Sequence, residues 1–154
     1  MSVRAIDMEE SIRFYVDVFG MEPIPTPNFG REVQWLRLGD QQLHLFQDDR
    51  PAPRFHHLGI DVDDFESVYS KVRELGVFDG DSLGPAVRRL PGGEVQMYLR
   101  DPAGNLVEVD WPDAGTLDTS VVGEIPKLAD TVPQSEESQR ARLYLAPEAE
   151  GGGE

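Results

Sequence analysis

Two different spacings of apolar residues follow one another in the first third of the chain. A helical stretch begins after Asp7, which is suited to cap a helix, and ends before Gly20. Its apolar residues recur at the spacing that places them on one helix face: Met8, Ile12, Tyr15, Val16 and Phe19. Short strands are expected around this helix, at residues 2–6, 21–27, 33–38 and 41–46, the second of them an edge strand because it contains proline.

The same order of elements returns after a polar linker, residues 48–54, that contains two prolines. A strand at 55–62 leads to a helix capped by Asp63 or Asp64 and ended by Gly76. Three further strands are expected at 86–90, 94–100 and 106–111. Two similar βα units arise by chance in many α/β proteins, but the recurrence of the full five-element order favours an internal repeat. We therefore predict an α+β protein with two tandem βαβββ modules, residues 1–47 and 55–111.

Residues 112–154 differ in composition from the modules. They contain few large apolar residues and end in Ala-Glu-Gly-Gly-Gly-Glu, which predicts an acidic and partly disordered tail. Two parts of the tail are expected to be ordered. These are residues 121–128 and a short helix at 135–145 with Ser135 as its cap, whose Leu143 and Leu145 would dock on the modules or on a partner chain.

Charge and the absence of cysteine exclude several classes of function. Lys and Arg total 14 against 29 Asp and Glu, which gives a net charge of −15. Such a polyanion repels nucleic acid and anionic membranes, so we expect neither as a partner. Without cysteine there are no disulfides, thiolate nucleophiles or cysteine-based zinc sites. No apolar run resembles a signal peptide or a membrane span, so we expect a cytoplasmic protein.

The residues that could bind a metal ion or take part in catalysis lie in the expected strands. Three histidines occur in them: His44, His56 and His57. Alternation turns Glu108 to the face opposite Val107 and Val109, which we expect to enter the core. Two imidazoles and one carboxylate suit a divalent first-row metal ion. On spacing alone, each of these residues equally fits an ordinary half-buried or solvated strand position.

Three segments carry a more specific pattern. They are residues 7–21, residues 57–64 and residues 98–108, the last with an Asp-Pro-Ala-Gly-Asn turn before Glu108. Together they resemble the vicinal oxygen chelate family, whose members include glyoxalases, bleomycin-resistance proteins and extradiol dioxygenases. The resemblance covers residues 2–111. It implies two βαβββ modules whose sheets curve around a shared cavity, with metal ligands on the first and last strands of each module.

Carried onto this sequence, the resemblance implies the metal ligands His44, His57 and Glu108, and Glu108 is also the expected catalytic residue. We expect the three side chains to converge on one ion, and alternation excludes His56. For the fourth ligand of the family, counting back from the first helix reaches Met1 or the position before it, and neither supplies a histidine. A first strand that extends further upstream, a three-ligand site and a metal-free protein are the alternatives. From the alternation of side chains along the strands, we expect five residues to line the wall of the cavity: Trp35, Arg37, Gln96, Tyr98 and Arg100.

The function implied by this resemblance is a metal-dependent enzyme acting on a small oxygenated substrate. A divalent ion (zinc, nickel, manganese or iron) would act as a Lewis acid on two neighbouring substrate oxygens. The reaction would be that of a glyoxalase-type lyase or isomerase, or of a dioxygenase. The alternative is a metal-free protein of the same fold that binds a small molecule or sequesters an antibiotic. The cavity would close either within one chain or across a homodimer.

Overall fold

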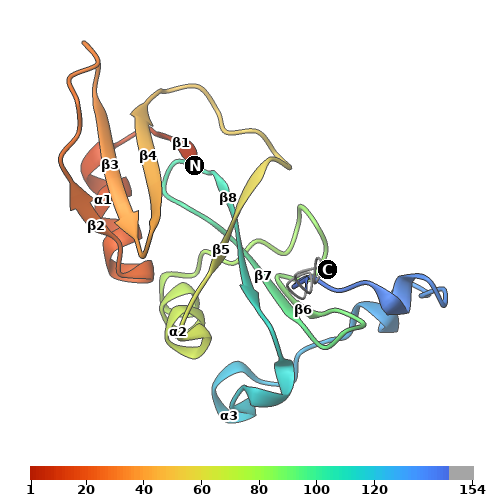
Figure 1. Ribbon diagram of the computed structural model, residues 1–154. Coiled ribbons are helices and arrows are strands. Elements are labelled where there is room, and N and C mark those ends of the chain that lie inside the picture. The colour runs from red at the N-terminus through yellow and green to blue at the C-terminus, as the bar shows by residue number, and fades with distance from the viewer. Residues whose placement is uncertain (146–154) are drawn as a thin grey trace, which may run out of the picture.

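The computed structural model describes residues 1–145 and contains two four-stranded sheets side by side (Figure 1). The first sheet is built from β1 (Ser2–Ala5), β2 (Glu22–Ile24), β3 (Val33–Leu38) and β4 (Gln41–Gln47). Its strand order is β1-β4-β3-β2, and β1 runs parallel to β4 while the other pairs are antiparallel. The helix α1 (Met8–Phe19) connects β1 to β2.

The second sheet repeats the first in order and direction. It contains β5 (His57–Asp61), β6 (Val87–Arg89), β7 (Val95–Arg100) and β8 (Leu106–Trp111), in the order β5-β8-β7-β6. Here too the first and last strands of the module are parallel, and the helix α2 (Phe65–Leu75) follows the first strand. The predicted α+β fold with two βαβββ modules is confirmed.

Local sequence signals set the ends of both helices. The Asp7 carboxylate accepts a hydrogen bond from the Glu10 amide at 2.9 Å, and the Asp64 carboxylate accepts one from the Ser67 amide at the same distance. Each helix ends at a glycine in the left-handed region, where residues with a Cβ are strained. The two helices therefore begin and end at equivalent positions of the two modules.

A carboxylate–tyrosine cluster joins the modules. The Asp101 carboxylate, in the turn before β8, accepts hydrogen bonds from the Ala103 and Asn105 amides at 3.0 and 2.8 Å. It also accepts one from the Tyr15 hydroxyl of α1 at 2.8 Å. The Asn105 side chain donates to the Arg4 carbonyl oxygen of β1 at 2.7 Å. One turn of the second module is thus bonded to a helix and a strand of the first.

The chain beyond β8 packs against the second module before it extends. It contains the 3-10 turns η1 (Ala114–Thr116), η2 (Leu128–Asp130) and η3 (Ser138–Arg140) and the short helix α3 (Thr119–Val122) beside α2. Leu117 and Val122 are buried in the core. The helix expected at 135–145 is limited to η3, whose N-cap is Glu137 and not Ser135. The Ser135 hydroxyl accepts a hydrogen bond from the Ser138 amide, and the residues after η3 extend toward the second sheet. The disorder expected beyond Pro147 lies outside the described residues.

None of the helices within residues 1–145 combines the length and the apolar composition that a membrane crossing requires.

Replacing Tyr15 with phenylalanine tests the junction between the modules. Tyr15→Phe removes one of the four donors to the buried Asp101 carboxylate, so we expect the free energy of unfolding to fall by about 1–3 kcal/mol. Urea denaturation measures it. Tyr69→Phe is the control, because within residues 1–145 the Tyr69 hydroxyl makes no hydrogen bond, and it should change stability by less than about 0.5 kcal/mol. Equal effects of the two substitutions would contradict the proposed link.

Candidate functional site

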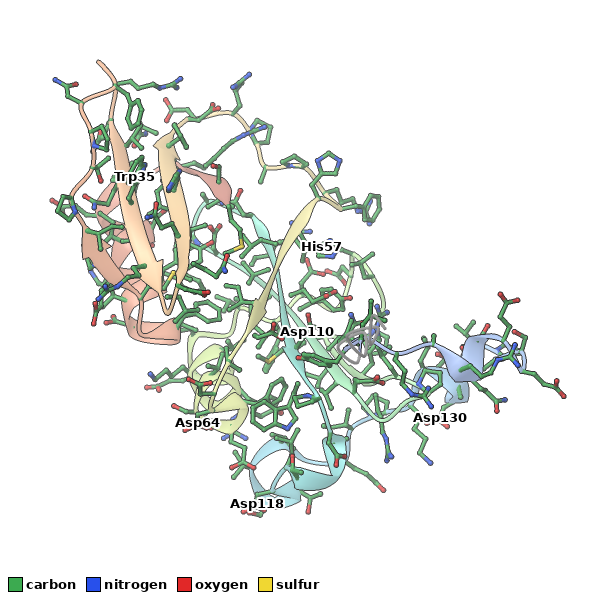
Figure 2. The ribbon with its side chains drawn as sticks, viewed as in Figure 1. Trp35, His57, Asp64, Asp110, Asp118 and Asp130 are labelled. Atoms are coloured by element: carbon green, nitrogen blue, oxygen red, sulfur yellow. The ribbon has the colours of Figure 1, made fainter. Side chains whose placement is uncertain are left out.

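The faces of the two sheets opposite their helices carry the candidate chemistry (Figure 2). In the first sheet, Leu43 and Leu45 are fully buried in the core while His44, between them, points to the other face. In the second sheet, Val107 and Val109 enter the core and Glu108 points away from it. The alternation predicted from the sequence is therefore present in both modules.

His57 and Glu108 lie close together on the second sheet. The Nε2 atom of His57 is 3.5 Å from the Oε2 atom of Glu108. The opposite ring nitrogen, Nδ1, donates a hydrogen bond to the Phe55 carbonyl oxygen at 2.8 Å. A neutral imidazole held in this way carries its lone pair on Nε2, the ring nitrogen that lies near the Glu108 carboxylate. Two of the three predicted metal ligands thus form a pair with the donor atoms that a cation requires.

A polar network holds the Glu108 carboxylate from the neighbouring strand. Tyr98 lies opposite Glu108 in the β7–β8 register, and its hydroxyl donates to Glu108 Oε2. Arg88 donates to the Tyr98 hydroxyl at 2.9 Å and to the Gln96 amide oxygen at 3.2 Å. Burial, together with the hydrogen bond to Glu108 and its charge, raises the pKa of Tyr98, so the hydroxyl stays protonated and donates.

The network contains two residues that the sequence analysis named and one that it did not. Gln96 and Tyr98 both reach the Glu108 side of the second sheet, as alternation indicated. Arg88 belongs to the same network and was missed. Its strand β6 has three residues, which is too short for a period of two to be recognised. Its register opposite Gln96 is visible only once β6 and β7 are paired.

Two further carboxylates extend the second-sheet face away from His57. Asp61 of β5 and Asp110 of β8 are opposite one another in the strand register. Burial, the charge of Glu108 and the charge of Asp61 raise the pKa of Asp110 to about 7. The sequence placed Asp110 on this face, but nothing in it distinguished Asp110 from other surface acids.

His44 occupies the corresponding face of the first sheet. Its ring stacks on Trp35 with centroids 4.4 Å apart and planes 9° from parallel. Its Nε2 atom donates to the Gln42 amide oxygen at 3.0 Å. Burial and the nearby amino terminus lower the pKa of His44, which favours the neutral imidazole. Arg37, also expected in the cavity wall, is exposed and pairs with Glu22 at 2.6 Å.

The three predicted ligands do not converge within one chain. Among residues 1–145, no three His, Asp or Glu side chains lie close enough to share an ion. The physical reason is that His44 belongs to the first sheet, while His57 and Glu108 belong to the second. In the strand registers, Ser2 lies opposite His44 and Gly59 lies opposite Glu108, so Ser2 and Gly59 are equivalent positions. His57 is two residues before Gly59, and the position two residues before Ser2 precedes Met1. This agrees with one of the two positions given by the residue count.

Arg100 fastens a loop and the linker to β7. Its guanidinium donates to Asp79 at 2.6 Å, and also to the Ser82 hydroxyl and to the Arg54 carbonyl oxygen. Burial acts in the opposite direction, but the Ser82 hydrogen bonds and this guanidinium lower the pKa of Asp79 to about 2. Arg100 was expected in the cavity wall, and the structure gives its side chain this anchoring role.

A cleft of about 320 Å³ opens between the modules beside His57. It is bordered by residues of both sheets and of the linker, among them Ser2, Arg4, Phe46, His56, His57 and Leu106. The cleft admits a small molecule to His57 from the side where β1 and β5 approach one another. His56, which alternation excluded as a ligand, lies at its border.

The paired βαβββ modules define the class of protein to which this chain belongs. Residues 1–109 match the Glyoxalase/Bleomycin resistance protein/Dioxygenase superfamily, and the chain belongs to this superfamily. A virulence protein of Salmonella typhimurium is 30% identical over 113 residues, which are 67% of this chain and 75% of that protein.

Solved structures share the same fold. Lactoylglutathione lyase from Agrobacterium tumefaciens is 25% identical with a TM-score of 0.54, covering 71% of this chain and 89% of the lyase. The fosfomycin resistance protein FosX from Listeria monocytogenes has a TM-score of 0.57 over 71% of this chain and 88% of FosX. At 15% identity, the likeness to FosX concerns the fold alone.

The raised pKa of Asp110 predicts a pH-dependent cost to stability. An acid whose pKa is higher in the folded state than in the unfolded state lowers the free energy of unfolding when it is ionised. For Asp110 this destabilisation reaches its maximum above pH 7. It disappears as pH falls from about 7 to about 4. Asp110→Asn should therefore stabilise the protein at pH 8 by about 1 kcal/mol after allowance for solvent screening, and by less at pH 5.

Urea denaturation at the two pH values measures this difference. Asp81→Asn is the matched control, because Asp81 is exposed and its carboxylate makes no hydrogen bond within the described residues. Its effect should be small and the same at both pH values. An Asp110→Asn variant that gains no stability at pH 8 would contradict the assigned ionisation.

Proposed function

We propose that this protein is a metal-dependent enzyme of the glyoxalase type, a lyase, isomerase or dioxygenase that acts on a small oxygenated substrate. The observation that carries the proposal is the His57–Glu108 pair. The Nε2 atom of His57 and the Oε2 atom of Glu108 are 3.5 Å apart. The Nδ1 atom of His57 donates a hydrogen bond to the Phe55 carbonyl oxygen. Metal-binding histidines are commonly oriented by such a bond on the other nitrogen.

The residues of the second sheet fit a divalent cation and a small ligand. An imidazole nitrogen and a carboxylate oxygen suit zinc, nickel, manganese or iron. A bound ion supplies Lewis-acid chemistry to substrate oxygens. Tyr98 orients the Glu108 carboxylate through its hydroxyl, and Arg88 places a positive charge beside Tyr98. The cleft between the modules gives a small ligand access to His57.

We further propose that His44 reaches the ion from a second copy of the chain. Its separation from His57 and Glu108 within one chain supports this arrangement. The first sheet presents His44 and Trp35 on a face with exposed aromatic surface, where Phe29 is 49% exposed and lies 6.0 Å from the Trp35 ring. A homodimer in which this face meets the second sheet of the partner would cover aromatic surface and complete the ligand set.

The second candidate function is metal-free binding or sequestration of a small molecule. Two hydrogen bonds favour it: Glu108 accepts one from Tyr98, and Nε2 of His44 donates one to Gln42. These bonds satisfy both groups without a cation. The same inter-module cleft would then hold the ligand.

Metal titration distinguishes the two functions. We expect wild-type protein to bind at least one of zinc, nickel, manganese and ferrous iron in calorimetric titration. Glu108→Ala and His57→Ala should each weaken binding at least about tenfold, because each removes a donor atom. Affinity should also fall as pH is lowered through about 6.5, where protons compete for ordinary imidazoles.

His56→Ala is the matched control and should leave metal affinity unchanged. If wild-type protein binds none of the four ions, the metal-free function is the better one. Binding that survives Glu108→Ala but not His56→Ala would show that the ligand set is wrong.

Mixing two defective variants tests whether the site is shared between chains. His44→Ala and Glu108→Ala should each bind metal weakly as pure proteins. A mixed dimer contains one site with intact His44, His57 and Glu108, so mixing after subunit exchange should restore up to one tight site per mixed dimer. Titration of the mixture gives the number of sites, and sedimentation gives the oligomeric state. A monomeric wild type, or a mixture without restored sites, would contradict the shared site.

A further inference from the structure

The described chain ends on the face of the second sheet that carries the candidate site. Residues 143–145, here called the C-terminal strap, return to this sheet after η3 (Figure 1). The Leu143 amide donates to the Glu94 carboxylate at 3.1 Å, and the Tyr144 hydroxyl donates to the Asp61 carboxylate at 2.6 Å. Glu94 immediately precedes β7 and Asp61 ends β5, so the strap spans the sheet across β8, the strand that lies between them.

The strap lies at the Asp110 end of the site and not at the His57 end. Asp110 is opposite Asp61 in the register and two residues from Glu108, which is about 7 Å along the strand. Figure 2 labels His57 and Asp110 at separate points along the second sheet. The cleft between the modules borders His57 and includes no residue of the strap.

Two hydrogen bonds and partial burial hold the strap in place. Leu145 is 87% exposed, whereas Tyr144 is 38% exposed and Leu143 is half-buried, so the strap is only partly covered. The phenol faces a group of acids, since burial, the hydrogen bond to Asp61 and the charges of Asp61, Asp110 and Glu94 raise the pKa of Tyr144. Its hydroxyl is therefore a neutral donor among carboxylates. A segment held by a few such bonds is docked but can be released.

We propose that the C-terminal strap covers the Asp61–Asp110 end of the site, and that Tyr144 thereby determines the length of ligand that reaches Glu108. A small ligand enters through the cleft at His57, and its far end meets Tyr144 about 7 Å beyond Glu108. That a ligand binds at Glu108 rests on the proposed function, whereas the covering of Asp110 by the strap does not.

Carbodiimide coupling of glycinamide to Asp110, followed by mass spectrometry, measures whether the C-terminal strap shields Asp110 from solvent. The measurement needs no metal. A chain that ends at Ala141 should react roughly tenfold faster at Asp110 than wild type, and Tyr144→Phe several-fold faster, because hydrogen bonds of ordinary strength are lost. A chain that ends at Leu145 is the matched control and should react like wild type. Asp81, which is exposed, is the internal reference for reagent activity. Equal rates at Asp110 in all four proteins would overturn the proposal.

Hydroxamates of two lengths then test ligand selection in zinc-loaded protein, since they chelate a metal through two neighbouring oxygens. Acetohydroxamate should bind wild type and the chain ending at Ala141 equally. Octanohydroxamate should bind the shortened chain about tenfold more tightly, as expected for apolar chain accommodated without obstruction. An unchanged preference for the short ligand would overturn the role of Tyr144. Wild type that binds none of zinc, nickel, manganese and ferrous iron would refute the proposed function, and the coupling rates alone would then show whether the strap covers Asp110.

Discussion

The buried carboxylate of Asp101 holds the two modules in their relative position. Its four hydrogen-bond donors come from the turn before β8 and from Tyr15 of the first module. Burial raises the pKa of Asp101 while the donors act in the opposite direction, so the ionised group is tolerated only with its bonds formed. Because β8 begins directly after this turn, the same cluster fixes the start of the strand that carries Glu108. Asn105, which belongs to the same cluster, also donates a hydrogen bond to the Arg4 carbonyl oxygen, and both residues line the cleft beside His57.

The pairing of β5 with β8 places three acidic side chains on the same face of the second sheet. Glu108, Asp110 and Asp61 lie on neighbouring positions of β5 and β8, and burial together with the charges of the other two acids raises the pKa of Asp110. Tyr98 and Tyr144 each direct a hydroxyl at one of these acids. A face that concentrates negative charge in this way depends on neutral donors such as these hydroxyls.

The duplicated fold places His44 and Glu108 at equivalent positions of the two modules. His44 and Glu108 occupy equivalent register positions, each opposite the same position of the first strand of its module. Each sheet packs its helix on one face, and the opposite face carries His44 or Glu108. The second sheet is partly covered by the chain's own C-terminal strap, whereas the first sheet keeps Phe29 and the Trp35–His44 stack at the surface.

Local signals in the sequence determined the elements and their faces. Asp7, Asp64 and the glycines that end the helices act within a few residues, so the bounds of α1 and α2 could be predicted, and alternation correctly turned Glu108 away from Val107. Tertiary structure decided what these faces meet. The distance from His57 to Glu108, the bond from Arg88 to Tyr98, and the separation of His44 depend on strand pairing between distant segments. The docking of Tyr144 on Asp61 joins residues 83 positions apart, and no local pattern encodes a contact of that separation.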